Sequence, residues 1–269
     1  MTESGSIDVR ANPTAGVQLA SCLIQAQWPA PANVVALTTT RLGGFSTAPF
    51  DSFNLALHVG DSEQAVLANR RQLLAQCAGL ERIQWLEQVH GTEVVTAPAA
   101  VTAADACYTQ QPALACAVMT ADCLPIVFCD GAGREVAAAH AGWRGLLAGV
   151  LEATVARFSA GPEQLLAWIG PAIGERYFEV GAEVRQAFIN VANAADREAT
   201  DGAFRASKQR QGHYFADLAA LARLRLRAIG LRQCYGGEQC CYQQEARFFS
   251  YRRQATTGRM ATLIYKLPI

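Results

Sequence analysis

Chemically reactive side chains stand at the ends of short apolar runs in this sequence. Cys123 precedes the apolar residues of "MTADCLPIVFCDG" (119–131), and His140 ends the next run, "EVAAAH" (135–140). His90 has a similar place upstream in "EQVHGTEV", between an apolar stretch and a glycine. Polar groups that several neighbouring strands present at their ends indicate a functional site more than a packed core.

Two imidazoles and one thiolate can hold Zn²⁺ or copper, and three protein ligands leave one coordination position open for water or substrate. Open sites of this kind are catalytic, because the metal lowers the pKa of bound water and provides a nucleophile at neutral pH. We therefore consider His90, Cys123 and His140 as metal ligands. Asp122, the neighbour of Cys123, could orient a ligand or transfer a proton.

A structural role for these residues is the alternative. A lone histidine at a strand end is more often a hydrogen-bonded structural residue, and a cysteine among apolar residues usually acts as a small hydrophobic side chain. The spacings of 33 residues (90 to 123) and 17 residues (123 to 140) match no short metal-binding signature, so spacing alone supports a metal site only weakly. The trio Cys234, Cys240 and Cys241 has the wrong spacing for a zinc knuckle, which favours buried or incidental thiols.

Three further residues could bind an anion. Arg41 leads the Gly-Gly turn of "TTTRLGGFS" (38–46), where its paired donors and nearby backbone N–H groups could hold a phosphate or carboxylate. Asn54 follows in the continuation of this block to residue 61, and Arg144, in "GWRG", starts a helix near His140. A solvated arginine on a surface turn is the plainer interpretation of Arg41, since such turns are common. His58, Asp105 and Arg252 are left without an assigned role.

Hydrophobic periodicity predicts the elements that position these residues. Strands are expected in seven places: 34–40, two short ones within 83–95, 113–120, 125–130, 135–140, 165–171 and 259–267. Helices are expected at 62–79, from Leu147 to Phe158, at 184–191, and between the capping residue Asp217 and Gly230. Strands and helices intermix without strict alternation, which predicts an α/β or α+β domain whose helices pack on a mixed sheet.

Composition narrows the class of protein. The chain has 269 residues, 51% hydrophobic and 17% charged, with zero formal net charge, so nothing points to nucleic acid and a small ligand is favoured. We find no signal peptide and no apolar run long enough to span a membrane. Nine cysteines, an odd number in a large chain, indicate reduced thiols and a cytoplasmic protein. Residues 1–20 are expected to be loosely ordered and residues 21–269 to form one domain.

Several blocks together resemble the YfiH-like family, also called the laccase-domain, multicopper polyphenol oxidase (DUF152) or peptidoglycan-editing-factor family. The blocks are "QVHG", "TADCLPI", "AHAGWRG", "IGPAIG", "YFADL", "RFFSYRR" and "TGRMATLI", in this order. The resemblance implies a single-domain α/β/α fold and a metal, usually zinc, held by His90, Cys123 and His140. It also favours an anion-binding role for Arg41, which stands in a segment like the family's "TxRxGGxS".

The resemblance implies a purine nucleoside phosphorylase that acts on adenosine, inosine, guanosine and methylthioadenosine, with adenosine deamination as a second activity. Its partners would be a nucleoside and phosphate, not nucleic acid or a membrane, and the protein would be a monomer or small homo-oligomer.

Three alternatives stay open. A copper-dependent polyphenol oxidase with several coppers needs many histidines, and this chain has four, so a single copper in the same site is the most it could hold. A metal-free amide hydrolase would use Cys123 as nucleophile and His140 or His90 as its base, for example to remove peptidoglycan precursors that carry L-serine. A non-catalytic binding module is the third.

Overall fold

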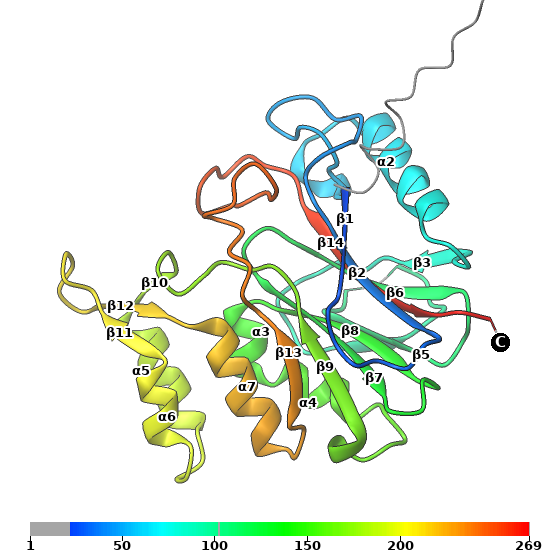
Figure 1. The fold of residues 1–269 in the computed structure, drawn as a ribbon. Helices are drawn as coiled ribbons and strands as arrows, with labels where there is room; N and C mark the ends of the chain where they lie inside the picture. The colour runs from blue at the N-terminus through cyan, green and yellow to red at the C-terminus, as the bar shows by residue number, and fades with distance from the viewer. Residues whose placement is uncertain (1–21, 102, 269) are drawn as a thin grey trace, which may run out of the picture.

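The computed structural model describes residues 22–101 and 103–268, so the segment expected to be loosely ordered, 1–20, lies outside the described residues. The described part holds two large sheets and one small sheet (Figure 1). The five-stranded sheet runs in the order β1 (Leu23–Gln25), β2 (Val34–Thr39), β14 (Met260–Lys266), β6 (Leu114–Thr120) and β3 (Arg82–Gln84). The six-stranded sheet runs in the order β13 (Gln233–Gly236), β9 (Leu165–Ile169), β7 (Leu124–Asp130), β8 (Val136–Ala141), β5 (Ala106–Thr109) and β4 (Val94–Thr96).

The two large sheets pack against each other because their central strands are apolar on both faces. Along β7, Val127 and Cys129 point toward the five-stranded sheet, while Ile126 and Phe128 point toward the helices on the other side. Strands buried on both faces read as continuous apolar runs, which is how β6, β7 and β9 appear in the sequence.

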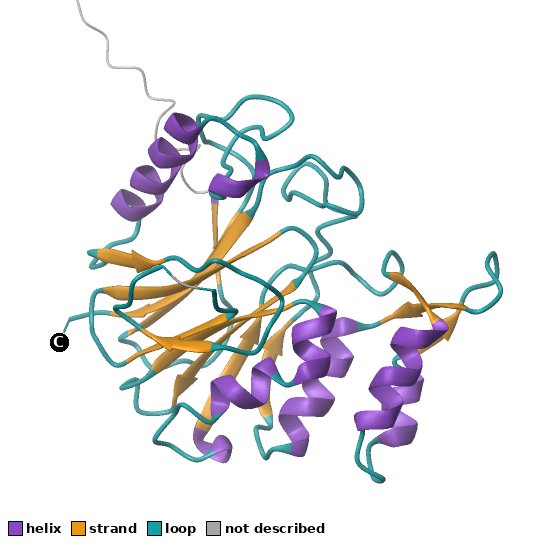
Figure 2. Ribbon diagram, turned by 180° about the vertical axis from the view of Figure 1, so that it is seen from behind, coloured by secondary structure: helices purple, strands orange, loops and turns teal. Residues whose placement is uncertain are grey.

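Helices cover the outer faces of the two sheets (Figures 1 and 2). Helix α2 (Glu63–Gln76) packs on the five-stranded sheet through Leu73. Helices α3 (Trp143–Ala148), α4 (Val150–Val155) and α7 (Leu218–Ala228) pack on the six-stranded sheet. The predicted mixed sheet core with helices on both sides is therefore confirmed, and this core consists of two stacked sheets.

The ends of the helices follow local sequence signals. Ser62 accepts a hydrogen bond from the backbone of Ala65 at the start of α2, and Asp217 accepts one from Ala220 at the start of α7. The single helix expected from Leu147 to Phe158 is wrong, because Gly149 has φ +105° and separates α3 from α4. Only glycine adopts this left-handed backbone readily, so the apolar periodicity continues across a break in the helix.

A small three-stranded sheet was not predicted. It consists of β10 (Glu179–Gly181), β12 (His213–Ala216) and β11 (Phe204–Ala206), and it lies beside α5 (Ala182–Val191) and α6 (Arg197–Gly202) at one side of the molecule (Figure 1). Two 3-10 turns, Leu57–Val59 and Pro162–Gln164, complete the described elements. Strands of three or four residues carry too little alternation to be recognised in the sequence.

Candidate active site

The β7–β8 hairpin places Cys123 and His140 side by side. Cys123 directly precedes β7, and His140 is the next-to-last residue of β8. The two strands are antiparallel, with Pro125 paired to His140 and Leu124 paired to Ala141, so the start of one strand meets the end of the other. Residues 17 positions apart in the chain are therefore neighbours across the sheet.

Asp105 attaches the His90 loop to this hairpin. Its buried carboxylate accepts hydrogen bonds from the backbone N–H groups of Val89, His90 and Gly91, at 3.2, 3.0 and 2.6 Å. Asp105 directly precedes β5, and the first residue of that strand, Ala106, pairs with Ala139 in β8. The backbone N–H of His140 also donates to the carbonyl of Asp105 at 2.7 Å. One aspartate thus fixes the turn that carries one histidine against the strand that carries the other.

Ligand atoms of His90, Cys123 and His140 all lie within 4.8 Å of one another, and no other group of three such residues occurs in the described part of the chain. The sulfur of Cys123 is 3.7 Å from Nε2 of His90, and the two imidazole rings meet edge to face at 4.7 Å between centroids. His140 is buried with 3% of its surface exposed, whereas His90 faces the solvent. The three side chains therefore converge at the edge of a pocket.

Gly142 lies close to His90 and Cys123, and its lack of a side chain leaves room for theirs. A Cβ at position 142 would lie 2.7 Å from Cδ2 of His90 and 3.1 Å from the sulfur of Cys123. The backbone at Gly142 has φ −58°, which any residue adopts, so space and not conformation requires glycine here.

Hydrogen bonds and charge prepare these groups for a positive ion. Burial raises the pKa of the Cys123 thiol, but the charge of His140 and hydrogen bonds from both histidines bring this pKa down to about 6. Burial lowers the pKa of His140, and the charge of Cys123 and the hydrogen bond to Asp105 raise it to about 9. For Asp105, burial is outweighed by hydrogen bonds from His140 and two backbone N–H groups, so its pKa lies below the ordinary value. At neutral pH the cysteine is a thiolate, which is the form that binds metals.

Asp122 is held beside the three residues in an unusual conformation. Its φ is +102°, and His90 also has a positive φ, of 61°. Non-glycine residues in this region are uncommon and concentrate at functional sites. The carboxylate of Asp122 accepts a hydrogen bond from the Cys241 thiol at 3.0 Å and one from the backbone N–H of Arg252 at 2.6 Å. Asp122 thereby connects the loop that carries Cys123 to Cys241 and to the segment 248–253.

A pocket of about 370 Å³ opens over the three converging residues. Its aromatic walls are Trp143, Phe178 and Tyr251. Its remaining lining residues are His58, Gln88, His90, Met119, Thr120, Ala121, Asp122, Cys123, His140, Arg144, Ile173, Arg252 and Arg259. Aromatic, basic and metal-ligating side chains therefore surround one space.

The residues predicted to bind an anion do not all reach this pocket. Arg144 lines it, with its guanidinium over the Trp143 ring at 4.4 Å. Arg41 lies outside the lining, because its guanidinium donates to the carboxylate and carbonyl of Asp51 and stacks on Phe249. Asn54 is fully buried and bonds to Asp61 and to the backbone of Arg259. Arg41 and Asn54 thus shape the loops behind the pocket.

Sequence analysis assigned no functional role to three residues of this region, which are Asp105, Arg259 and Cys241. Asp105 was considered without a role, although an acidic residue at the start of a short strand is a usable signal. Arg259 stands in "TGRMATLI", and Cys241 in the cysteine trio interpreted as buried or incidental. Cys241 is buried, as expected, but its thiol bonds to Asp122. No local pattern shows that Cys241 and Arg259 meet loops more than 100 positions away.

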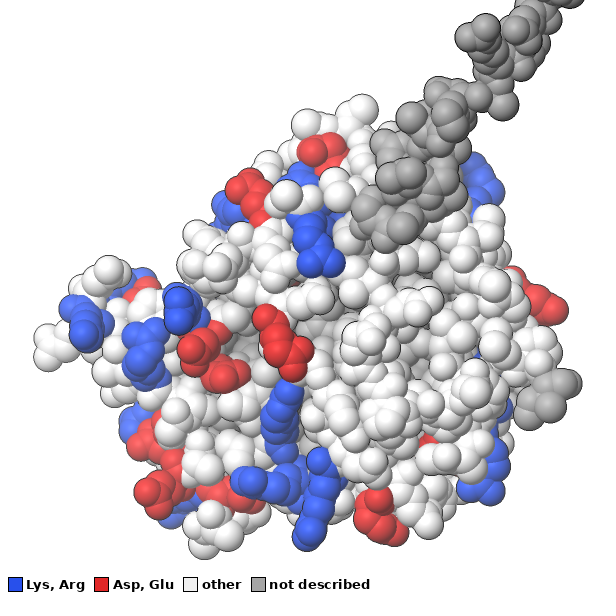
Figure 3. Space-filling view, viewed as in Figure 1, with Lys and Arg blue, Asp and Glu red and all other residues white. Residues whose placement is uncertain are grey.

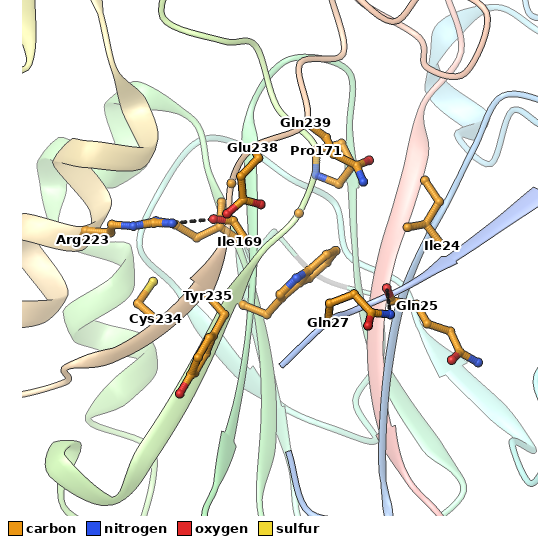
Figure 4. Close-up of a pocket in the computed structure, with 14 residues that line it drawn as sticks. Ile24, Gln25, Gln27, Ile169, Pro171, Arg223, Cys234, Tyr235, Glu238 and Gln239 are labelled. Carbon is orange, nitrogen blue, oxygen red and sulfur yellow. Dashed lines mark hydrogen bonds between the residues drawn. The ribbon is translucent and has the colours of Figure 1, made fainter. Parts of the chain in front are cut away.

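A second pocket, of about 570 Å³, lies between β1, β9 and β13, away from the converging histidines (Figure 4). Figure 4 shows Arg223 and Glu238 on one side of it and Ile24 and Gln25 on the other. Cys234 lines it, and burial raises the pKa of this thiol to about 11. None of the described residues lining this pocket is a histidine, so the pocket over Cys123 is the candidate active site.

Comparison with known proteins identifies the family of this chain. Residues 35–266 match the family described as multi-copper polyphenol oxidoreductase laccase. The chain belongs to this family. The predicted resemblance to YfiH-like proteins is thereby confirmed, since the chain is 52% identical over 248 residues to the purine nucleoside phosphorylase YfiH of Escherichia coli, covering 91% of this chain and 99% of that protein. A purine nucleoside phosphorylase of Pseudomonas aeruginosa is 54% identical over 240 residues, covering 88% of this chain and 96% of that one.

Solved structures of the laccase-like family have the same fold. The crystal structure of a Neisseria meningitidis protein is similar with a TM-score of 0.86 and 46% identity, and covers 92% of this chain and 100% of that chain. YlmD from Geobacillus stearothermophilus is similar with a TM-score of 0.79 and 34% identity, over 88% and 93% of the two chains.

The donor set in this family member fits a metal ion such as zinc. Nδ1 of His140 donates to Asp105 at 2.7 Å, so Nε2, the nitrogen that faces Cys123, is the one that would bind a metal in place of its proton. Two imidazole nitrogens and one thiolate are ligands that zinc and copper accept, and three ligands leave one position open. The narrow space that Gly142 leaves beside His90 and Cys123 keeps these donors in contact.

The surface and helices add two observations. On the face seen in Figure 3, acidic and basic side chains are interspersed without an extended patch of one sign, in keeping with the zero net charge. No helix among residues 22–101 and 103–268 combines the length and apolar character that a membrane span requires.

Proposed function

We propose that this chain is a zinc-dependent purine nucleoside phosphorylase that acts on adenosine, inosine, guanosine and methylthioadenosine. The observation that carries the proposal is the convergence of His90, Cys123 and His140 in a pocket that also holds aromatic and basic side chains. The relatives from Escherichia coli and Pseudomonas aeruginosa are named purine nucleoside phosphorylases, which supports the same activity.

The pocket has surfaces for each part of a nucleoside and for phosphate. Trp143, Phe178 and Tyr251 offer rings on which a purine base can stack. Arg144, Arg252 and Arg259 provide positive charge for an oxyanion. The sugar then lies between the base and the oxyanion, near the three metal-ligating side chains. A volume of about 370 Å³ is in the range of small-molecule sites.

Phosphorolysis joins an oxygen of phosphate to C1′ of the sugar while the bond from C1′ to the purine nitrogen breaks. The electron pair of that bond goes to the base, which takes up a proton and leaves, and a sugar 1-phosphate remains. A zinc ion held by His90, Cys123 and His140 would act as a Lewis acid toward the bound substrate. The chain's own contribution is to hold both reactants in line and to keep charge balanced around them.

Asp122 has a positioning role in this proposal. Both of its oxygens accept hydrogen bonds, one from the Cys241 thiol and one from the backbone N–H of Arg252, so both are engaged in holding this loop. Its place beside Cys123 fixes the loop that presents the thiolate. The proton for the departing base then comes from solvent or from phosphate itself.

Adenosine deamination is the second activity that we propose for the same pocket. In this reaction water adds to C6 of the purine and ammonia leaves, so no phosphate is consumed. The base must then turn its C6 edge toward the metal-ligating side chains instead of its sugar. The two reactions are separable in one assay, because only phosphorolysis depends on phosphate.

The test uses purified protein with adenosine or inosine, with and without inorganic phosphate. We expect free base and sugar 1-phosphate only with phosphate, and loss of both products in Cys123→Ala. Cys234→Ala is the matched control, since Cys234 lines the other pocket and should leave turnover unchanged. Failure of the wild-type protein to release base in the presence of phosphate would refute the proposal.

A cysteine hydrolase is the second candidate, because the pKa of Cys123 is lowered to about 6 by neighbouring histidines. Such a thiolate could attack an amide, with His140 or His90 as the base. Chelation separates the two candidates: it should abolish phosphorolysis, with recovery on adding Zn²⁺, whereas a thiol hydrolase should keep its activity. Amide hydrolysis of a peptidoglycan precursor that survives chelation would favour the hydrolase.

Copper oxidation of phenols, the activity in the family description, has less support. The described residues contain one group of three metal-ligating side chains, and the whole chain has four histidines. Metal analysis of protein from cells without metal supplements decides this point. We expect zinc near one per chain, and copper at that level would instead favour the oxidase.

We also propose a cytoplasmic enzyme with small-molecule partners only. The cysteines from Cys77 onward form no disulfide in the described residues, which fits a reducing compartment.

A further inference from the structure

We propose that Arg259, supported by His58, forms the phosphate subsite of this pocket; the inference rests on the proposed function. The sequence pointed to Arg41 and Asn54 for anion binding, and the structure does not bring their side chains to the pocket lining. Arg259, in the "TGRMATLI" block, does line it, together with His58.

The guanidinium of Arg259 presents one free edge. Its Nη1 donates to the carbonyl oxygens of Thr257 and Gly258, at 2.9 and 3.0 Å. No hydrogen bond within the described residues occupies Nε or Nη2. These two nitrogens lie on the same edge of the guanidinium, and this edge matches two oxygens of a phosphate with paired N–H donors.

The backbone around Arg259 is held in place before any ligand binds. The N–H of Arg259 donates to the side-chain oxygen of Asn54 at 2.9 Å. A Cβ at Gly258 would lie 2.7 Å from the ring of Phe249 and 2.9 Å from Cβ of Asn54, so this turn is tightly packed. Asn54 therefore acts on the anion site indirectly, through the segment that carries Arg259. A preorganised arginine loses less entropy on binding than a mobile one.

The guanidinium of Arg259 lies in a half-buried place near other basic side chains. Arg259 is half-buried, and neither it nor Arg70 has a carboxylate within 4.0 Å among the described residues. Arg70 lies behind the pocket wall, with Nη2 at 3.9 Å from the sulfur of Met119. Burial and then the charges of Arg259 and Arg70 lower the pKa of His58, which places its imidazole close to the two guanidinium groups. A cluster of this kind is stabilised by a bound anion.

The position of Arg259 also suits the reaction. The charges of Cys123 and Asp122 act on its guanidinium, so Arg259 lies near the metal-ligating residues. A phosphate on its free edge is then next to the place where C1′ of the sugar would lie. The other two arginines are less suited, because Arg144 and Arg252 are both exposed to solvent, whereas Arg259 is half-buried.

The experiment compares the KM for phosphate and the KM for inosine in Arg259→Gln. Loss of two charge-assisted hydrogen bonds should raise the phosphate KM about a hundredfold, while the inosine KM changes by less than about threefold. Arg259→Lys keeps the positive charge but loses the paired N–H donors of the guanidinium, and should raise the phosphate KM about tenfold. Arg71→Gln, an exposed arginine of α2, is the control and should match the wild type.

A wild-type phosphate KM in Arg259→Gln would overturn the assignment of this subsite. Melting temperature and zinc content should match the wild type, and Arg259→Lys provides the answer if the glutamine variant does not fold. Calorimetric titration of inorganic phosphate into the wild type and Arg259→Gln, without nucleoside, tests the subsite separately from turnover. Phosphate binding that requires Arg259, in a protein that releases no base, would retain the subsite and refute the proposed function. Equal binding to both proteins would refute the subsite alone.

Discussion

The carboxylate of Asp105 accepts a hydrogen bond from Nδ1 of His140 at 2.7 Å, at a place where both residues are buried. The same carboxylate binds the backbone of the turn that carries His90. One side chain therefore sets the tautomer of one proposed ligand and the position of another. This arrangement of a carboxylate behind a histidine is the usual support of a metal-binding imidazole.

Asp105→Asn should weaken metal binding without unfolding the protein. The amide presents one acceptor where the carboxylate presents two, so the His140 ring and the His90 turn lose part of their support. We expect metal affinity to fall about 10- to 100-fold, measured by competition with a chromophoric chelator. Asp130→Asn is the control: Asp130 is equally buried and bonded to backbone N–H groups, but it lies at the opposite end of β7 from Cys123. Unchanged metal affinity in Asp105→Asn would contradict this role.

Gly142→Ala should disturb the site by contact alone. The added methyl would lie 2.7 Å from Cδ2 of His90 and 3.1 Å from the sulfur of Cys123, so one of these side chains must move. Displacement of a site residue by about an ångström can cost about a hundredfold in rate, and we expect a loss of that order in kcat/KM for inosine. Gly202→Ala is the matched control and should keep its rate, because a Cβ at this position meets nothing within 4 Å. Equal rates in the two variants would show that the space at Gly142 is unimportant.

Cys123 should react as a thiolate in protein freed of metal by a chelator. Its pKa is about 6, and because the thiolate is the reactive form, alkylation by iodoacetamide should rise through pH 6 and level off above pH 7. The slow alkylation of Cys123→Ala reports the remaining thiols, among which Cys234 has a pKa of about 11. Added Zn²⁺ should protect Cys123. A midpoint near the ordinary thiol pKa of about 8.5 would show that the histidines do not stabilise the thiolate.

Asp130 should stabilise the fold in a pH-dependent way. Burial raises its pKa, but hydrogen bonds from the backbone of Glu135 and from Arg134 outweigh this, so the pKa lies below the ordinary value. The stabilisation is therefore complete above the unfolded-state pKa of about 4 and disappears as pH falls through the lower folded-state pKa. Urea unfolding at pH 7 should show Asp130→Asn less stable by about 2 kcal/mol, and the difference should shrink at acid pH. A difference independent of pH would reject the charge as its cause.

The sequence by itself determined most of the individual elements. Apolar runs marked β6, β7, β8 and β9, since strands buried on both faces leave continuous hydrophobic stretches. Asp217 marked the start of α7, since capping depends on its side chain and the next backbone N–H groups. The break at Gly149 and the short strands of the three-stranded sheet were not predicted. Hydrophobic periodicity does not detect a single residue with left-handed backbone or strands of three or four residues.

His90, Cys123 and His140 were found as reactive residues at strand ends, and their joint role came from the family resemblance. Only the tertiary structure decided which other residues share their pocket. Arg41, chosen for its glycine turn, bonds to Asp51 instead, while Arg259 comes to the site from a distant part of the chain and Asp105 joins the two histidine segments. Local patterns depend on neighbours in sequence, whereas a pocket depends on how two sheets stack and where their loops meet. That information resides in contacts between residues far apart in the chain, so the fold had to be seen before the site could be completed.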